Sequence, residues 1–297
     1  MLYGSDVTDG EGYLRIGELA RRTGTSPELL RAWEQRYGLL DPSRSSGGFR
    51  LYSDEDEARV LTVKRLIADG LSAAEAARAT LGGEAIPDAE VGSITDGLAG
   101  DLRAALDRFD EVGANEVFDR LLAALSVETV LQDVLLPYLR ILGDRWARGE
   151  ASVAQEHFAS ALIRGRLLGL ARGWGAGSGP ALVLACPPGE EHDLGLIMFG
   201  IVVSRRGWRV TYLGQDTPFA TVEEAVAAVD PQLVVLAVSA GTDLTVNEGA
   251  IRKLAERVAV AVGGAGMTEA EGSALGLTIL AGDPVEVGRS LSLPAAV

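Results

Sequence analysis

The sequence predicts a multidomain protein of the α and α/β classes: an N-terminal winged helix-turn-helix, a central four-helix bundle and a C-terminal Rossmann-like doubly wound parallel sheet. Three observations predict these parts: two short helical segments around a tight turn, then apolar residues at helical spacing, then short apolar runs alternating with helical segments. Gly-rich joints at 82–97 and 172–180 separate the parts. We therefore expect domains at 13–81, 97–172 and 180–297.

The N-terminal part begins with a helix expected at about 16–22, followed by a tight turn through Gly24. Ser26 is a residue type that caps helices, and Pro27 suits the first helical position because its missing N–H has no helical partner there. A second helix is therefore expected to reach about Tyr37. Two short helices joined by such a turn are typical of a helix-turn-helix.

A basic surface accompanies this helix pair, although the whole chain is acidic. The formal net charge of −15 argues against bulk binding to phosphate. Residues 13–53, however, carry seven Arg against four acidic residues, a net charge of +3. The segment DPSRSSGGFRLYS adds a predicted hairpin with Gly47 and Gly48 at its tip, a wing able to reach DNA phosphates. The candidate DNA-binding residues are Arg15, Arg44, Arg50 and Tyr52, together with Arg31, Trp33, Arg36 and Tyr37 on the expected surface of the second helix.

The strings IGELA, LRAWEQRYGLL and GGFRLYS in residues 13–65 resemble the DNA-binding domain of MerR-family transcriptional regulators. The resemblance implies that Arg31, Arg36 and neighbouring aromatic residues address the major groove and the DNA backbone, and that Arg44 and Arg50 belong to the wing. It also implies binding to double-stranded operator DNA as a dimer. No long heptad pattern follows residue 75, so the downstream parts are expected to assemble the oligomer. A helix pair that does not bind DNA is the alternative.

The middle part, about 97–172, has apolar residues every three or four positions and almost no strand-type alternation. Interruptions at Gly113, at Ser126 and at 149–152 divide it into four segments. A bundle of four helices is the structure that this pattern favours.

The last part alternates strands of five or six residues with helices, which indicates a parallel sheet covered on both faces. The expected strands are ALVLAC, RVTYLG, LVVLAV, VAVGG and LTIL, with helices at 193–206, 219–228, 247–258, 267–274 and from about 284.

His192 lies in the stretch CPPGEEHDLG, directly after the first of these strands. Ligands of doubly wound sheets bind at the carboxyl ends of the strands, and a neutral imidazole is a good ligand for a transition metal. Glu190 can accept the other ring N–H and fix the tautomer. Ser239, Gly263 and Gly264 end neighbouring strands and leave room for a bulky cofactor. A surface or helix-capping histidine is the alternative.

The pattern Glu190-x-His192-x-x-Gly195, with Ser after the third strand and Gly-Gly after the fourth, resembles the cobalamin-binding fold of methionine synthase and related corrinoid proteins over residues 180–297. The resemblance implies that His192 is the lower axial ligand of cobalt and that the nucleotide tail passes the Ser and Gly positions. Glu190 stands where many members have Asp, and Ser239-Ala240-Gly241 stands where they have Ser-x-Leu. The candidate cofactor-binding residues here are Glu190, His192, Asp193, Gly195, Ser239, Gly241, Gly263 and Gly264.

Trp146 is followed, after nine residues, by Glu156 and His157. Alone, these residues fit a core anchor and a solvated helix face. Together with the flanking parts they resemble the motif of CarH-type regulators, light-responsive repressors that use adenosylcobalamin. The resemblance implies that Trp146, Glu156 and His157 surround the adenosyl group, and that the dark form assembles as a tetramer on its operator. Light-sensing members carry His where this chain has Ala147, so cofactor sensing is better supported than light sensing.

The expected function is that of a cobalamin-dependent transcriptional repressor, not an enzyme, which binds operator DNA as a homodimer or homotetramer under the control of adenosylcobalamin. Alternatives are a light-insensitive cobalamin sensor, a corrinoid methyl carrier of a methyltransferase system, and a regulator whose C-terminal half binds another ligand or only oligomerises. The single Cys186 excludes a disulfide framework. No secretory leader and no run of about 18 apolar residues is evident, so a cytoplasmic protein without a membrane partner is expected.

Overall fold

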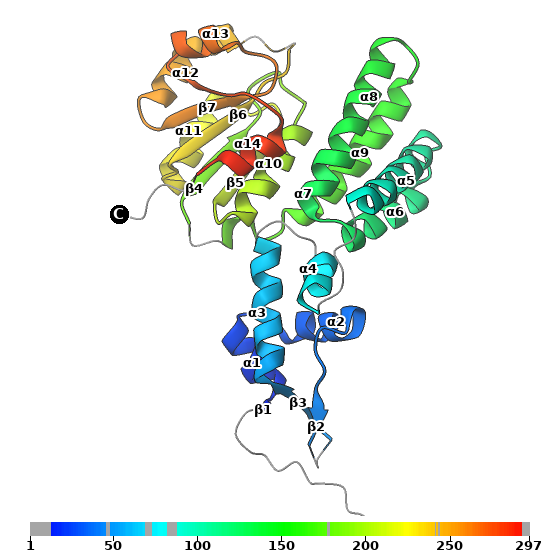
Figure 1. Cartoon of the computed structure of the whole chain (residues 1–297). Coiled ribbons are helices and arrows are strands. Elements are labelled where there is room, and N and C mark those ends of the chain that lie inside the picture. Colours follow the sequence, from blue (N-terminus) through cyan, green and yellow to red (C-terminus); the bar gives the residue numbers. More distant parts are fainter. Residues whose placement is uncertain are drawn as a thin grey trace, which may run out of the picture. The chain divides into compact units, whose positions relative to one another are not determined.

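The computed structural model describes residues 13–45, 48–68, 73–81, 88–176, 179–240, 242 and 244–292 (Figure 1). The chain divides into two compact units, Met1–Leu139 and Arg140–Val297. Within the described residues, no helix is long and apolar enough to cross a membrane.

The first unit opens with the predicted winged helix-turn-helix. Helix α1 ends at Thr23 and is capped by Gly24, whose φ of 58° lies in the left-handed region that favours glycine. Ser26 caps the next helix because its Oγ accepts a hydrogen bond from Leu29 N at 3.2 Å, and Pro27 is the first helical residue, as predicted. The elements are β1 (Tyr13–Leu14), α1 (Ile16–Thr23), α2 (Pro27–Tyr37), β2 (Ser43–Arg44), β3 (Arg50–Ser53), α3 (Asp54–Ala68) and α4 (Ala73–Thr80), with the antiparallel sheet order β1-β3-β2.

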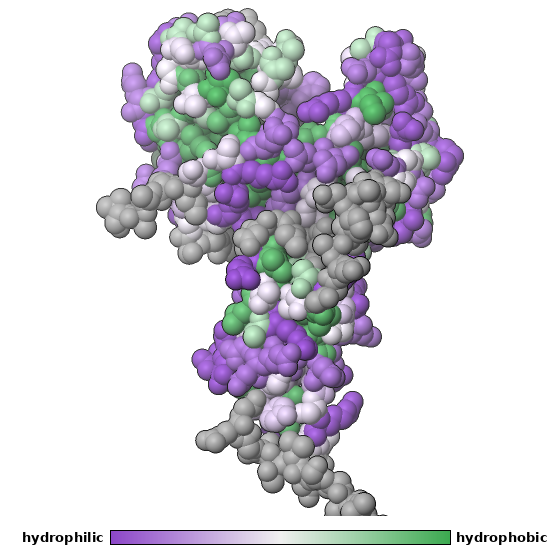
Figure 2. Space-filling view, in the orientation of Figure 1, coloured by the Kyte–Doolittle hydropathy of each residue, from purple (hydrophilic) through white to green (hydrophobic). Residues whose placement is uncertain are grey.

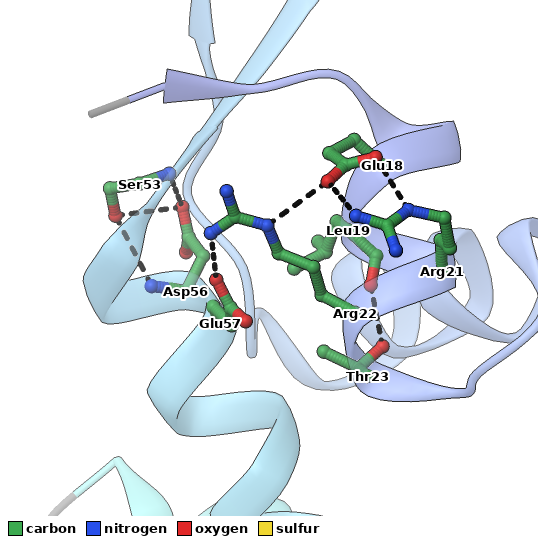
Figure 3. Close-up of polar contacts among 8 residues, drawn as sticks. All are labelled: Glu18, Leu19, Arg21, Arg22, Thr23, Ser53, Asp56 and Glu57. Atoms are coloured by element: carbon green, nitrogen blue, oxygen red, sulfur yellow. Dashed lines mark hydrogen bonds and ion pairs between the residues drawn. The ribbon is translucent and has the colours of Figure 1, made fainter. Parts of the chain in front are cut away.

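A polar network on the surface of this domain ties α1 to α3 (Figure 3). Arg22 donates to Glu18 Oε1 and to Glu57 Oε2, each at 3.1 Å, and Arg21 donates to both Glu18 oxygens. The hydrogen bonds from Arg21 and Arg22 lower the pKa of Glu18 to about 2. Figure 2 shows a hydrophilic surface in the region of α1. Arg21 and Arg22 are therefore engaged within the domain.

Four helical segments follow, as predicted: α5 (Asp88–Asp107), α6 (Glu111–Ala124), a continuous run of α7 (Val127–Thr129), the π-helix η1 (Val130–Leu135) and α8 (Leu136–Ala147), and then α9 (Val153–Leu170). The boundary between the two units falls inside α8. The predicted joint at 82–97 is wrong in its second half, because α5 begins at Asp88. The buried Leu102, Ala105 and Leu106 lie on this helix, and their packing outweighs the helix-weakening effect of Gly97 and Gly100.

The second unit contains the predicted doubly wound sheet. Five parallel strands are arranged in the order β5-β4-β6-β7-β8. The chain turns from β5 on one side of β4 to β6 on the other, which creates a topological switch point beside β4. The strands are β4 (Ala181–Ala185), β5 (Arg209–Gly214), β6 (Leu233–Ala237), β7 (Ala259–Gly263) and β8 (Thr278–Leu280), and the helices are α10 (Leu194–Arg205), α11 (Phe219–Val229), α12 (Glu248–Ala255), α13 (Glu269–Ala274) and α14 (Pro284–Ser290), with short 3-10 turns η2 (Trp174–Ala176) and η3 (Leu244–Asn247).

Helices cover both faces of this sheet, so β4 is fully buried and β6 and β7 are buried in their central residues. Val183 and Leu236 face α11 and α12 and join Val222 and Ile251 in one core cluster. Helix α14 packs on α10 so closely that a Cβ at Gly288 would lie 2.9 Å from Val202. This burial on two sides explains the continuous apolar runs read in the sequence.

Candidate functional site

The first candidate site lies in the loop that joins β4 to α10. The side chain of His192 is 82% exposed, whereas that of Glu190 is 1% exposed. Glu190 Oε1 lies 2.7 Å from His192 Nδ1 and accepts the backbone N–H of His192 at 2.8 Å. With Nδ1 donating to this carboxylate, the Nε2 lone pair of a neutral imidazole is free for a metal ion.

Glu190 is itself held from a neighbouring strand. Its Oε2 accepts the backbone N–H of Ser239 at 2.5 Å and the hydroxyl of Thr242 at 2.8 Å, both beyond the carboxyl end of β6. Burial raises the pKa of Glu190, but the hydrogen bonds from Ser239, His192 and Thr242 outweigh burial and hold it at about 2. The carboxylate therefore stays charged and keeps the imidazole oriented.

A cavity of about 310 Å³ opens beside His192, at the carboxyl end of the sheet between β6 and β7 and against α10 and α14. Its lining is mostly apolar, and His192 and Ser239 are polar groups in it. The predicted Gly195, Ser239, Gly263 and Gly264 all line it, while Gly241 lies outside the described residues. The remaining lining residues are Leu196, Phe199, Val235, Leu236, Ala237, Val238, Ala240, Ala265, Leu280, Gly282, Pro284 and Val287.

The two glycines after β7 serve different purposes. Gly264 has φ of +100°, and a Cβ there would lie 2.4 Å from the carbonyl oxygen of Val238. That glycine is required by the backbone. At Gly263 nothing lies within 4 Å of a built Cβ, so its missing side chain leaves open space in the cavity wall.

Asp193 does not line this cavity. It is buried, and its Oδ2 accepts hydrogen bonds from Arg164 Nε at 2.7 Å and from the hydroxyl of Tyr212. The structure therefore gives Asp193 protein partners in place of the direct cofactor contact predicted for it.

Trp146, Glu156 and His157 lie on α8 and α9 and are absent from the cavity lining. Trp146 is 54% exposed, which excludes the core-anchor alternative. Glu156 accepts a hydrogen bond from Ser160 Oγ at 2.7 Å and pairs with His157 Nδ1 at 3.0 Å. Ala147 is exposed beside Trp146 and has no ligating atom.

The second candidate site is the arginine surface of the winged helix. Arg31 and Arg36 on α2 and Arg44 on the wing are exposed, and none of them has an ion pair with another described residue. Arg15 lies over the exposed ring of Phe49, 4.8 Å from its centroid, and Arg50 pairs with Glu34 at 2.9 Å. The structure therefore separates arginines with free heads from those already engaged.

The predicted surface position of Trp33 is wrong. Trp33 is 4% exposed and Tyr52 is fully buried, and both belong to the core of the winged helix with Leu30. Burial, together with the hydrogen bond that the Tyr52 hydroxyl donates to Glu34 Oε2 at 2.9 Å, raises the pKa of Tyr52 to about 12. Tyr37 is half-buried against the same core. The three aromatic rings thus belong to, or pack against, the core of the winged helix, whose surface carries the exposed arginines.

Family models match three consecutive stretches of the chain. Residues 14–81 match the MerR HTH family regulatory protein model, and residues 98–168 and 180–288 match two models described as B12 binding domains. HTH-type transcriptional repressor CarH of Myxococcus xanthus is 36% identical over 251 residues, which is 81% of this chain and 83% of the relative. The chain belongs to the CarH/CarA family. CarA of the same organism is 40% identical over 233 residues, 75% of each chain.

Structural similarity supports the same fold. The Methanosarcina barkeri monomethylamine corrinoid protein superposes with a TM-score of 0.52 at 21% identity, covering 63% of this chain and 93% of that protein. Members of the CarH/CarA family are transcriptional regulators and not enzymes, which disfavours the methyl-carrier alternative. The chain thus combines a MerR-type DNA-binding region with cobalamin-binding regions.

The residues of the α/β unit fit cobalamin. A free Nε2 on an oriented His192 is suited to cobalt, and the apolar cavity with an open wall at Gly263 is suited to an elongated tail. Sequence reasoning missed Thr242, Arg164 and Tyr212 as supports of this site. Thr242 lies only three residues beyond the predicted Ser239 and could have been found from a search for donors to Glu190.

Replacing Gly263 with leucine is expected to weaken cobalamin binding by roughly tenfold or more, because the new side chain projects into the cavity. Gly249→Leu is the matched control, since a Cβ there also meets open space but the residue lies outside the cavity lining. Titration of both purified variants by absorbance measures the difference. Equal affinity in the two variants would show that the tail does not use this cavity.

Proposed function

We propose that this protein is a cytoplasmic transcriptional repressor that binds operator DNA as an oligomer and whose assembly is controlled by adenosylcobalamin. The observation that carries the proposal is the presence, in one chain, of a winged helix whose Arg31, Arg36 and Arg44 are exposed without an ion pair among the described residues, and of a His192–Glu190 pair beside an apolar cavity. Family membership in CarH/CarA supports the coupling of these two sites.

We propose roles for these residues that the geometry supports. His192 would hold cobalt through Nε2 while Glu190 fixes its tautomer, and Gly195, Ser239, Gly263 and Gly264 would border the nucleotide tail. Trp146, Glu156 and His157 would face the upper ligand from α8 and α9, and Trp146 has the exposed ring that this role requires. Adenosylcobalamin supplies a weak cobalt–carbon bond that light can break.

A second candidate function, a cobalamin sensor without a light response, is favoured by Ala147. The methyl side chain at this position cannot coordinate a metal ion, so the residue after Trp146 offers no replacement for a lost upper ligand. A ligand shifts an assembly equilibrium only by its different affinity for the two states. A response to light therefore requires that loss of the adenosyl group alone changes the relative affinity of the cofactor for the assembled and the disassembled state.

The test is size-exclusion chromatography with absorbance detection on apo-protein mixed with adenosylcobalamin in the dark, before and after green light. The proposal predicts that the cofactor co-elutes with an oligomer larger than the apo-protein. Ala147→His is run beside the wild type. Disassembly of the wild type in light supports photoreception, whereas disassembly of Ala147→His alone supports the sensor. A protein that elutes without cobalamin overturns both.

A further inference from the structure

Side chains from two elements of the second unit, α9 and β5, converge on Asp193, the residue that follows His192. The carboxylate of Asp193 is buried, with 1% of the residue exposed. Its Oδ2 accepts a hydrogen bond at 2.7 Å from Arg164 Nε on α9 and another from the hydroxyl of Tyr212 on β5. A buried carboxylate is stable only with such partners, because it has lost its hydration.

The position of Asp193 makes this arrangement unusual. It is the N-cap residue of α10, where an Asp side chain ordinarily accepts from the first backbone N–H groups of the helix. Asp193 makes no such cap. Its carboxylate is turned to Arg164 and Tyr212, so its interaction with these two side chains replaces the local one.

Both partners are firmly held. The ring of Tyr212 meets that of Trp174 edge to face, with centroids 5.9 Å apart, and Trp174 packs against Gly200 of α10. Burial and the contact with Asp193 raise the pKa of Tyr212 well above its usual value, so its hydroxyl remains a donor. The hydrogen bond to Asp193 raises the pKa of Arg164.

Arg164 also lies on the same helix as His157, one of the residues proposed to face the upper ligand. It follows His157 by seven residues on α9, about two helical turns, so the two side chains project from the same side of the helix. Helix α9 packs on α10, which begins directly after Asp193. One helix thus carries His157 and the arginine that holds the neighbour of His192.

We propose that Arg164 and Tyr212 are positioning residues, which hold Asp193 so that His192 is aimed for coordination and which couple the orientation of His192 to the position of α9. The inference rests on the proposed role of His192 as a cobalt ligand. It adds that movement of α9 on the upper-ligand side is transmitted to the lower ligand through the Arg164–Asp193 pair, because the two sites share that helix.

The first arm of the test uses apo-protein, so it does not depend on the cofactor. Arg164→Gln and Tyr212→Phe are compared with the wild type by backbone hydrogen exchange over residues 188–195. We expect exchange to quicken about tenfold or more in Arg164→Gln, because a hydrogen bond to a charged group is lost. Arg172→Gln is the matched control: it removes an exposed arginine just beyond α9. Arg164→Lys keeps the charge and is expected to restore slow exchange in part.

The second arm uses cobinamide, a corrinoid without its own nucleotide base, so any nitrogen bound below cobalt comes from the protein. Electron paramagnetic resonance of the reduced cobalt(II) form reports that nitrogen. At saturating cobinamide, the ratio of nitrogen-coordinated to uncoordinated cobalt is expected to fall about tenfold in Arg164→Gln and to recover in Arg164→Lys. A role in folding alone would lower the melting temperature and leave this ratio unchanged.

The outcomes separate the two proposals. Unchanged apo exchange in Arg164→Gln overturns the positioning role alone, and so does faster exchange with an unchanged nitrogen signal. Absence of protein nitrogen on cobalt in the wild type overturns the proposed role of His192, and the positioning role with it. Faster exchange together with loss of the nitrogen signal, both rescued by lysine, supports the inference.

Discussion

His192→Ala is expected to raise the Kd for adenosylcobalamin by more than about a hundredfold, because the substitution removes the nitrogen proposed to ligate cobalt. Glu190→Gln is expected to raise it by roughly tenfold to a hundredfold, the usual effect of removing a partner of a metal-bound histidine. The amide nitrogen of the new Gln cannot accept, so one of the two sets of donors around Glu190 loses its acceptor. Absorbance titration of the purified variants measures both values.

Glu191→Ala is the control for this experiment. Glu191 is exposed between the two residues, and its backbone carbonyl, which the substitution retains, is the group that Gln215 contacts. Its Kd should match that of the wild type. If His192→Ala binds adenosylcobalamin as tightly as Glu191→Ala, His192 is not the ligand.

Arg31→Ala and Arg44→Ala are each expected to weaken specific DNA binding by roughly tenfold to a hundredfold per protomer contact, and to leave cobalamin binding unchanged. Both side chains are exposed without an ion pair among the described residues, so their charges are available to the grooves and phosphates of DNA. An operator selected from a random duplex library, followed by gel-shift titration at two salt concentrations, supplies the measurement.

Arg21→Ala is the matched control, since Arg21 is an exposed arginine of the same domain that is already paired with Glu18. We expect it to bind DNA nearly as the wild type does. A loss in Arg21→Ala equal to that in Arg31→Ala would mean that net charge, rather than the surface of α2, determines binding. Unchanged binding in both Arg31→Ala and Arg44→Ala would contradict the assigned interface.

Local patterns in the sequence predicted most of the fold. The strands of the α/β unit were found because each is a short apolar run closed by Gly or polar residues, and two-sided burial produces that pattern. The error at Trp33 was avoidable, since Leu30 and Trp33 are three positions apart and share the buried face of α2. The start of α5 could not be predicted in this way, because packing of the helix outweighs the low helix propensity of its glycines.

The same distinction applies to the site. The Glu190–His192 pair was predictable, because the two residues are separated by two positions in one loop. The protein partners of Asp193, which was predicted as a cofactor contact, were missed because they are separated from it by 29 and 19 positions in the sequence. Only the packing of α9 and β5 around α10 brings Arg164 and Tyr212 together with it. Contacts between residues so far apart in the sequence depend on how the chain folds and are not visible in a local pattern.

The side chain of Glu190 joins two loops through its two oxygens, one toward His192 and one toward Ser239 and Thr242. Aspartate, which the resemblance to the cobalamin-binding fold leads one to expect at this position, is shorter by one methylene and would reach only one of these loops without a backbone shift. Positions 190 and 242 are therefore expected to co-vary among relatives, with a hydroxyl at 242 accompanying glutamate. Finding both substitutions together in relatives would indicate when the loop that carries His192 became hydrogen-bonded to the loop after β6.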